Sequence, residues 1–156
     1  MGDPKRIRKK YERPKHLWQR ARLEEDTLLK KEYGCKNMTE VWKVKAKLRR
    51  FRKQARKLIG AMGEQAEKEK EQLIAKLQRL GLLTPEKNSL DDVLALTVRD
   101  LMERRLQTLV FRKGLARSIK EARQLITHGH IAIGDKKIFS PNYLVLKEEE
   151  DKIRKI

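Results

Sequence analysis

The chain has 156 residues, of which 40 are lysine or arginine and 22 are aspartate or glutamate, so its formal net charge is +18. A charge of this size attracts polyanions, and no apolar run is long enough to cross a bilayer, so we expect a nucleic acid rather than a membrane as the partner. Cys35 is the only cysteine, which excludes an intrachain disulfide and a thiolate zinc cage, and the N-terminus lacks the apolar segment of a secretory signal, so we expect a cytosolic protein without metal.

Residues 1–40 are predicted to be a basic extended arm that contains one short helix. The first 22 residues contain two prolines, dense cations and no sustained apolar periodicity, which is typical of segments that become ordered on a partner. We expect the short helix between Glu24 and Tyr33. Tyr11 and Trp18 either stack on bases or anchor the arm on its own domain, and the sequence leaves both possibilities open.

Residues 41–99 are predicted to form a helical domain. Over 41–59, apolar residues recur three or four positions apart, which predicts an amphipathic helix capped by Thr39 or Asn37. The rest of that helix is basic with almost no acids, and because solvated faces normally mix both signs, this favours contact with phosphates. A second helix over 64–80 interleaves glutamate with lysine, which favours a scaffold role.

Two capping boxes precede the last basic segment of the chain. Ser89 with Asp92 opens a short predicted helix, and Thr97 with Asp100 opens a longer one over residues 98–114.

The segment 118–138 predicts a helix, a glycine stop and a hairpin. Ser118 and Glu121 form a third capping box, apolar residues follow at helical spacing, and Gly129 can adopt the left-handed conformation that ends a helix. A glycine–aspartate pair between two short apolar runs then predicts a hairpin turn. Residues 148–156 are predicted to be a charged tail.

Several motifs follow one another over residues 100–145, namely ERRLQT, V-F-x-x-G-L-A-x-S-I, A-R-x-L-I, H-G-H-I and the Ser140-Pro141 turn. Together they resemble the RNA-binding domain named after ribosomal protein S-four, a helix pair packed on a small sheet. Upstream, YGCKNMTEVWKVKAKLRRFRKQAR and LGLLTPEKNSLDDVLAL are similar to the helical domain of the same family in its archaeal and eukaryotic form. The fold class is therefore expected to be α+β and mostly helical, with the RNA-binding domain over 100–147.

The resemblance implies a structural constituent of the small ribosomal subunit, located in the cytoplasm, without enzymatic activity or cofactor. Members of the family are primary binders of small-subunit rRNA that nucleate assembly at a multi-helix junction near the RNA 5′ end, and they touch neighbouring small-subunit proteins at an interface linked to translational accuracy. An autonomous homo-oligomer is not expected. Because A-form RNA hides its base edges in a deep major groove, we expect contacts with phosphates and 2′-hydroxyls.

The predicted RNA-binding residues are cations from three segments, and no catalytic or metal-binding residue is predicted. In the RNA-binding domain they are Arg104, Arg105, Arg112, Lys113, Arg117, Lys120, Arg123, His128, His130, Lys136 and Lys137. In the arm they are Lys5, Arg6, Arg8, Lys9 and Lys10. In the helix over 41–59 they are Lys45, Lys47, Arg49, Arg50, Arg52, Lys53, Arg56 and Lys57. We expect that replacing Arg104, Arg105 and Arg123 together by glutamate severely weakens rRNA binding with little loss of helicity.

The sequence features also bear on four alternative functions. A relative in a small nucleolar ribonucleoprotein that processes pre-rRNA shares the architecture, although the ERRLQT and SIKEAR segments favour the ribosomal member. An RNA-modifying enzyme would need a catalytic domain, for which the first hundred residues offer no nucleophile, general-base pair or phosphate-binding glycine loop. A DNA-binding helix-turn-helix is disfavoured by the hairpin that follows the Ser118 helix. His128 and His130 lack a carboxylate or thiolate that would complete a metal site, so a hydrogen-bonding role is expected.

Overall fold

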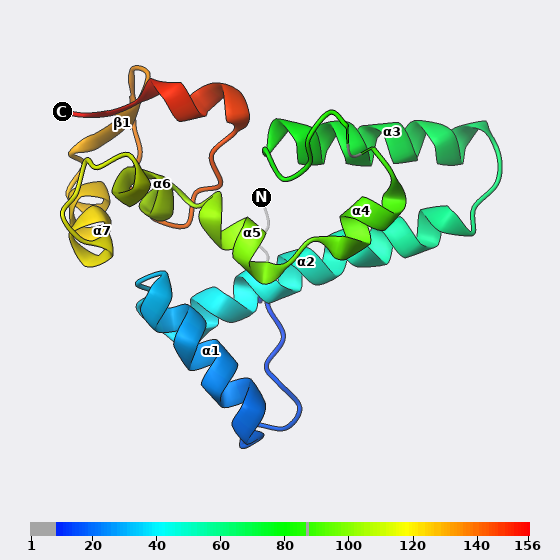
Figure 1. Cartoon of the computed structure of the whole chain (residues 1–156), viewed down its shortest axis with the longest axis horizontal. Coiled ribbons are helices and arrows are strands. Elements are labelled where there is room, and N and C mark those ends of the chain that lie inside the picture. The colour runs from blue at the N-terminus through cyan, green and yellow to red at the C-terminus, as the bar shows by residue number, and fades with distance from the viewer. Residues whose placement is uncertain (1–8, 87) are drawn as a thin grey trace, which may run out of the picture.

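The computed structural model describes residues 9–86 and 88–156, and the predicted contacts Lys5, Arg6 and Arg8 lie outside the described residues. The expected α+β, mostly helical fold is confirmed (Figure 1). The helices are α1 (Arg20–Glu32), α2 (Met38–Ile59), α3 (Glu64–Arg79), α4 (Leu90–Ala95), α5 (Val98–Glu103), α6 (Leu106–Arg112), α7 (Ile119–Thr127) and the 3₁₀ helix η1 (Lys147–Lys152). The strands are β1 (Ile131–Ile133), β2 (Lys136–Lys137) and β3 (Ile153–Lys155). Within the described ranges no helix combines the length and the apolar character needed to span a membrane.

The helices α2, α3 and α4 enclose the larger apolar core. Asn37 caps α2, since its side-chain oxygen accepts a hydrogen bond from the amide of Glu40 at 3.3 Å, which decides between the two predicted caps. The predicted apolar stripe of α2 is buried against α3 and α4, with Phe51 and Leu77 among the buried side chains. Figure 1 shows α3 folding back along α2, and the α2 cations Arg50, Lys53, Arg56 and Lys57 are exposed.

The single helix predicted over 98–114 is wrong, because the chain breaks between α5 and α6. Arg105 adopts an extended backbone with φ −74° and ψ 141°, and it pairs with Leu144 in an isolated antiparallel bridge. The amide of Leu106 donates to the carbonyl of Tyr143 at 2.8 Å. The helical periodicity continues across the break, but these backbone bonds to a distant segment replace helical bonds at this point.

The predicted tail is also wrong, because residues 147–155 complete the RNA-binding domain. The sheet has the order β2-β1-β3, with both pairs antiparallel, so β3 covers the edge of β1 that the hairpin leaves free. Ile153 is buried in the same apolar cluster as Val110, Ile126 and Ile131. A buried isoleucine within a charged stretch therefore makes the C-terminal segment structural.

The capping predictions hold with one difference. Both upstream boxes, Ser89 with Asp92 and Thr97 with Asp100, are formed. The Ser118 hydroxyl accepts from the amide of Glu121, but the Glu121 carboxylate accepts from the amide of Arg117 at 2.7 Å. The carboxylate thus reaches one residue beyond the predicted cap. Gly129, with φ +77°, ends α7 as predicted.

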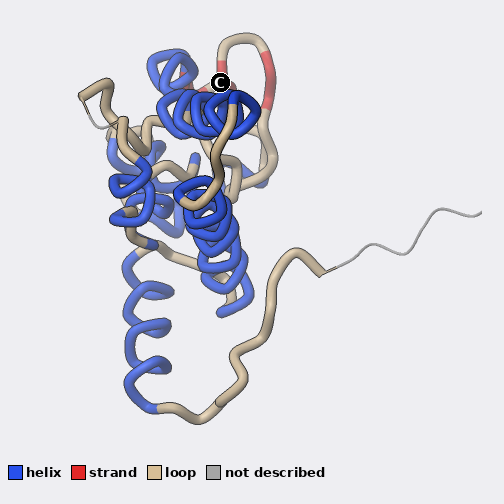
Figure 2. The backbone as a smooth tube through the Cα atoms, turned by 90° about the vertical axis from the view of Figure 1, so that its right-hand side faces the viewer, coloured by secondary structure: helices blue, strands red, loops and turns tan. Residues whose placement is uncertain are grey.

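The predicted arm over residues 1–40 is only partly an arm. The helix α1 begins earlier than predicted, and Leu29, Tyr33 and Cys35 are buried with Val41 and Met102 in a third apolar cluster. Residues 20–40 therefore belong to the folded body, and the described part of the extended segment is 9–19, which runs as a loop beside α1 and α2 (Figure 2).

The extended segment is attached to α1 and α2 by side-chain contacts. The Tyr11 ring lies 6.1 Å from the Trp42 ring, centroid to centroid, and Arg49 bonds Glu12 at 2.5 Å. The Arg22 guanidinium donates to the carbonyl of Leu17 at 2.6 Å. Tyr11 is therefore an anchor of the arm on its own domain.

Candidate nucleic-acid interface

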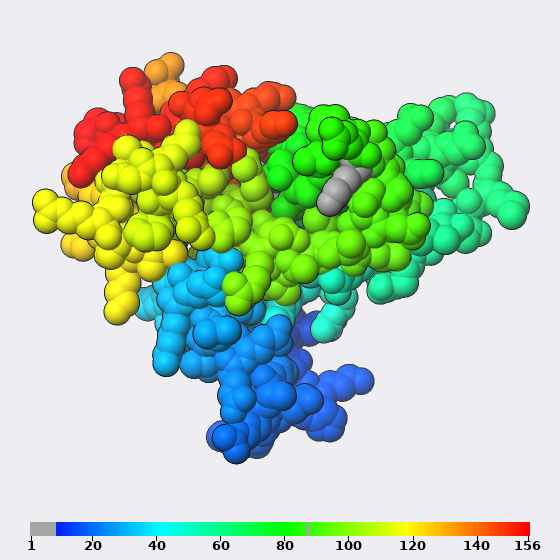
Figure 3. All heavy atoms as spheres, in the orientation of Figure 1, coloured from blue at the N-terminus to red at the C-terminus, as the bar shows by residue number. Residues whose placement is uncertain are grey.

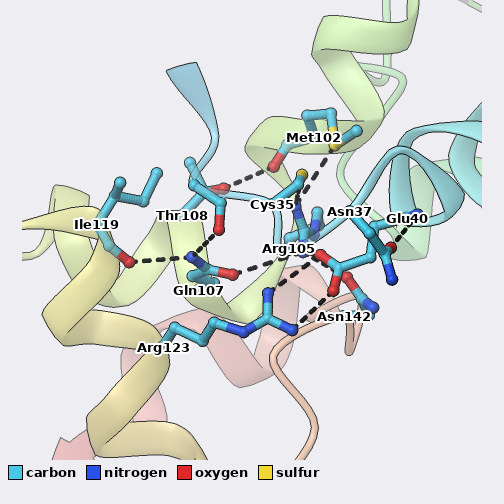
Figure 4. Close-up of polar contacts among 11 residues, drawn as sticks. Cys35, Asn37, Glu40, Met102, Arg105, Gln107, Thr108, Ile119, Arg123 and Asn142 are labelled. Atoms are coloured by element: carbon cyan, nitrogen blue, oxygen red, sulfur yellow. Dashed lines mark hydrogen bonds and ion pairs between the residues drawn. The ribbon is translucent and has the colours of Figure 1, made fainter. Parts of the chain in front are cut away.

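A buried polar cluster joins the helical domain to the RNA-binding domain. It is centred on the Arg105 side chain, which is only 1% exposed (Figure 4). Arg105 Nη2 donates to Glu40 Oε2 at 3.1 Å, and Arg105 Nη1 donates to Cys35 Sγ at 3.1 Å. The Asn142 side-chain oxygen is a further acceptor of Arg105 Nη2. We call this set the Arg105 cluster: Cys35, Glu40, Arg105, Gln107, Arg123 and Asn142.

Glu40 is the anion of the Arg105 cluster and is shared by two arginines. Arg123 of α7 holds both of its carboxylate oxygens, with Nη2 to Oε1 at 2.6 Å and Nη1 to Oε2 at 3.1 Å. Burial pushes the pKa of Glu40 upward, but the hydrogen bonds and charges of Arg123 and Arg105 together outweigh it, so this pKa lies below its ordinary value. One carboxylate at the start of α2 thus ties α2 to both α7 and the α5–α6 break.

Gln107 and Gly34 close the junction beside this ion pair. Gln107 Nε2 donates to the carbonyl of Gly34 at 3.1 Å and to that of Ile119 at 2.9 Å. Gly34 has φ +57°, and a Cβ added there would lie 2.8 Å from Ile119 Cγ2. Glycine is therefore required both by the backbone conformation and by the close approach of α7.

The burial of Arg105 removes it from the predicted RNA-binding surface. Arg104 and Arg123 are also largely engaged, since Arg104 Nη1 bonds Glu150 Oε2 at 2.6 Å and Arg123 is paired with Glu40. Replacing these three arginines by glutamate would therefore place three anions against existing carboxylates. We therefore expect this triple variant to lose folded structure rather than to retain its helicity, because a buried anion without a cationic partner is strongly destabilising.

Other predicted cations also have partners within the chain. Lys45 bonds the buried carboxylate of Asp26 at 2.6 Å, and Arg52 donates to the carbonyl of Leu96 at 2.6 Å. Lys47 is half-buried, and burial together with the charge of Lys76 lowers its pKa. The bonds of Lys45 and Arg52 therefore hold α2 against its neighbours.

The partly exposed cations at the end of α6 are paired as well. Arg112 Nη2 bonds Glu103 Oε1 at 3.1 Å, and Lys113 donates to the backbone carbonyl of Glu150. Glu103 also accepts a hydrogen bond from the Tyr33 hydroxyl at 3.0 Å, and burial together with this bond raises the pKa of Tyr33 to about 12. These bonds fix the C-terminal end of α6 to its surroundings.

Two shallow grooves collect cations from different segments. The first, which we call the arm groove, lies between the extended segment and α2, and its lining cations are Lys9, Lys10, Arg49, Arg50 and Lys53. Among the described residues that line it, Glu12 is the one acid, and it is paired with Arg49. The structure thus brings together the arm and the α2 cations that the sequence predicted separately.

The second groove, which we call the junction groove, lies where the end of α1 meets α7, and Figure 3 shows these two segments in contact. Its lining cations are Lys30, Lys31, Lys36, Lys120 and Arg123. Sequence reasoning missed the first three of these. Lys30 and Lys31 lie in the last turn of α1, where basic residues are ordinarily explained by the helix dipole, and Lys36 lies in the connection to α2. The Arg105 cluster lies directly behind this groove, since Cys35 and Arg123 belong to both.

Comparison with known proteins identifies the family. The S4 domain model matches residues 104–151. Relatives named small ribosomal subunit protein uS4 come from three archaea. The protein of Methanococcus aeolicus is 52% identical over 98% of this chain and 86% of its own length. That of Methanothermobacter thermautotrophicus is 51% identical, over 98% and 89%, and that of Ignicoccus hospitalis is 52% identical, over 98% and 92%.

This chain belongs to the uS4 family of small ribosomal subunit proteins. The resemblance stated from the motifs is confirmed over nearly the whole chain, and the S4 domain match at residues 104–151 overlaps the segment 100–147 that was predicted to be the RNA-binding domain. The match begins at Arg104, which is where the chain breaks between α5 and α6. The Arg105 cluster therefore connects the S4 domain of this uS4 member to its helical domain.

The remaining predicted cations of the S4 domain are exposed. They are Arg117, Lys120, His128, His130, Lys136 and Lys137. The two histidine rings stack with centroids 6.5 Å apart. Within residues 9–86 and 88–156, no three side chains of the kinds that ligate metals come together. On α2, Arg56 and Lys57 are exposed like Arg50 and Lys53.

Proposed function

We propose that this uS4 family member is a structural constituent of the small ribosomal subunit, in the cytoplasm, that binds small-subunit rRNA through the arm groove and the junction groove. The observation that carries the proposal is that each groove gathers five cations from at least two segments, with one paired acid lining the arm groove. Concentrated positive charge on a concave surface attracts the RNA backbone and raises the rate of association.

The Arg105 cluster supports this role by fixing the spacing between the two grooves. A rigid protein surface recognises folded RNA by matching the arrangement of its phosphates rather than its sequence. Arginine suits such contacts because its planar guanidinium can hold a phosphate through two hydrogen bonds. Bonds from Arg105 and Arg123 to one carboxylate make the helical domain and the S4 domain a single scaffold for both grooves.

The finer role is proposed from the family resemblance. The protein would bind early, at a multi-helix junction near the RNA 5′ end, nucleate assembly, and contact neighbouring small-subunit proteins at an interface that affects accuracy. It would act without catalysis. The curated relatives are named small ribosomal subunit proteins, which favours this role over the pre-rRNA-processing alternative.

A pair of charge-matched double variants tests the proposed surface. Arg50→Glu with Lys53→Glu reverses two exposed cations of the arm groove, whereas Lys68→Glu with Lys70→Glu makes the same change in charge on α3. Filter binding to a transcript of the 5′ domain of small-subunit rRNA should show a loss of at least about tenfold for the first variant only. Equal losses would show that net charge, and not the groove, governs binding.

Sedimentation of the native protein on a sucrose gradient tests the ribosomal role. Stable co-migration with mature small subunits supports it. Presence in precursor particles alone would instead support the pre-rRNA-processing alternative.

A further inference from the structure

Trp18 differs from every other described aromatic residue in being almost fully exposed. The residue is 89% exposed, whereas Tyr11, the other aromatic residue of the extended segment, packs against Trp42. The sequence left open whether these aromatic residues anchor the arm or stack on bases. The structure shows that Tyr11 anchors the segment, whereas Trp18 has no such packing in the described structure. A large apolar ring in this position is available to a partner.

The backbone that carries Trp18 is held in place. Trp18 lies in the turn immediately before α1, and the Arg22 guanidinium donates to the carbonyls of Leu17 and His16, at 2.6 and 3.3 Å. The other Arg22 bond, to the buried carboxylate of Asp26 at 2.9 Å, fixes that guanidinium in turn. The ring is thus presented at the N-terminal end of α1, which projects from the body of the protein (Figure 1).

The surroundings of Trp18 combine an apolar surface with positive charge. A shallow hollow is lined by Lys15, His16, Leu17, Trp18 and Gln19, and none of these described residues carries a carboxylate. A base has a flat apolar face and an attached phosphate, so it matches a ring with a lysine beside it. A purely apolar protein partner would leave the Lys15 ammonium without a counter-charge.

We propose that Trp18 is a stacking platform for an unpaired nucleotide of the bound RNA, with Lys15 near its phosphate. The inference rests on the proposed rRNA-binding function and specifies one part of the contact. Stacking of a base on an aromatic side chain is tolerant of sequence, and it requires a base that is not enclosed in a duplex.

The test measures affinity for two RNAs with three variants of the full chain. Trp18→Ala should weaken binding to the 5′-domain transcript by about 5- to 150-fold, and Trp18→Phe, which keeps a ring, should lose less. Leu28→Ala is the matched control, because Leu28 is a 56% exposed apolar residue of α1, the helix that follows Trp18, and this variant should bind like the wild type. On a fully paired RNA duplex all four proteins should bind alike.

Tryptophan fluorescence adds a direct reading of the contact. The chain has two tryptophans, so the difference between the wild type and Trp18→Phe isolates the emission of Trp18, and stacking on the transcript should quench it. The stacking proposal would be overturned, with rRNA binding left intact, if Trp18→Ala bound the transcript as tightly as the wild type and the Trp18 emission of the wild type were not quenched by the transcript. A change in Trp18 emission that needs another small-subunit protein would overturn it in favour of a protein contact. If the wild type binds neither RNA, the proposed function fails and the stacking with it.

Discussion

Arg105 and Arg50 are the same residue type in the same strongly basic chain, yet they serve different purposes. Arg105 is buried and bonded to Glu40, Cys35 and Asn142, whereas Arg50 is exposed on α2 and lines the arm groove. Burial and pairing decide which cations hold the fold and which are free for a polyanion. A count of lysines and arginines therefore overstates the RNA-binding surface.

The contrast extends to the way each region depends on its neighbours. The Arg105 cluster takes residues from the α1–α2 connection, α2, the α5–α6 break and α7, and most of its polar atoms are bonded to one another. The exposed basic face of α2 comes from one helix whose opposite stripe is buried. Changes in the cluster should therefore affect stability, and changes on the face should affect binding.

The largest expected effect comes from Arg105→Met. Removing the guanidinium leaves the buried carboxylate of Glu40 with Arg123 alone, so we expect a loss of about 3 kcal/mol in the free energy of unfolding, at the low end for a broken buried pair. Urea denaturation measures this. The matched variant Arg50→Met should change stability by less than about 0.5 kcal/mol. Equal losses of unfolding free energy in Arg105→Met and Arg50→Met would contradict the distinction between a structural arginine and a surface arginine.

Gly34→Ala should come next in size. The alanine would have to keep φ near +57° and would bring its Cβ to 2.8 Å from Ile119, so we expect a loss of about 1–3 kcal/mol. Gly60→Ala is the control, because Gly60 has φ −92° and no atom within 4 Å of an added Cβ. Thermal unfolding of both variants tests the comparison. A Gly34→Ala protein as stable as Gly60→Ala would mean that α7 does not approach the α1–α2 connection so closely.

A smaller effect is expected in the pH dependence of stability. Since the pKa of Glu40 is lowered in the folded state, its contribution is fully present above the unfolded value, about 4.3, and is lost as the pH falls through the folded pKa. The difference in unfolding free energy between the wild type and Glu40→Gln should stay constant from about pH 7 to 5.5 and narrow below about pH 4.3. Urea titrations at several pH values measure this difference in unfolding free energy. A difference that stays constant below about pH 4.3 would contradict the stabilising role of the ionised Glu40 carboxylate.

The smallest expected effect is on the salt dependence of RNA binding. Each lost phosphate contact should reduce the slope of log affinity against log salt concentration by roughly 0.7–0.9. Arg50→Met should show this reduction, whereas Arg105→Met, assayed where it remains folded, should keep the wild-type slope. The reverse pattern would exchange the roles of the two arginines.

Much of the fold could be predicted because it depends on local signals. Each of these signals can be recognised from a short segment of sequence: the apolar stripe over 41–59, the capping pairs at Ser89 and Thr97, and the helix end at Gly129. Such signals act over one or two helical turns, and the structure reproduces them. The position of the hairpin is likewise fixed by its local turn.

The features that could not be predicted depend on contacts between distant segments. The break at Arg105 arises because Leu144 pairs with it, although the helical pattern continues through 98–114. The pairing of β3 with β1 and the burial of Ile153 are equally non-local. At the candidate interface, Lys30 and Lys31 become part of a groove only because α7 lies beside the end of α1.

Chemical modification of arginines in the free protein and in its RNA complex tests the central distinction most directly. Phenylglyoxal treatment followed by mass spectrometry reports which guanidinium groups are accessible. We expect Arg50, Arg56 and Arg117 to be modified in the free protein and Arg50 to be protected by the 5′-domain transcript, while Arg105 remains unmodified in both states. Modification of Arg105 in the free protein, with protection by the RNA, would contradict the account.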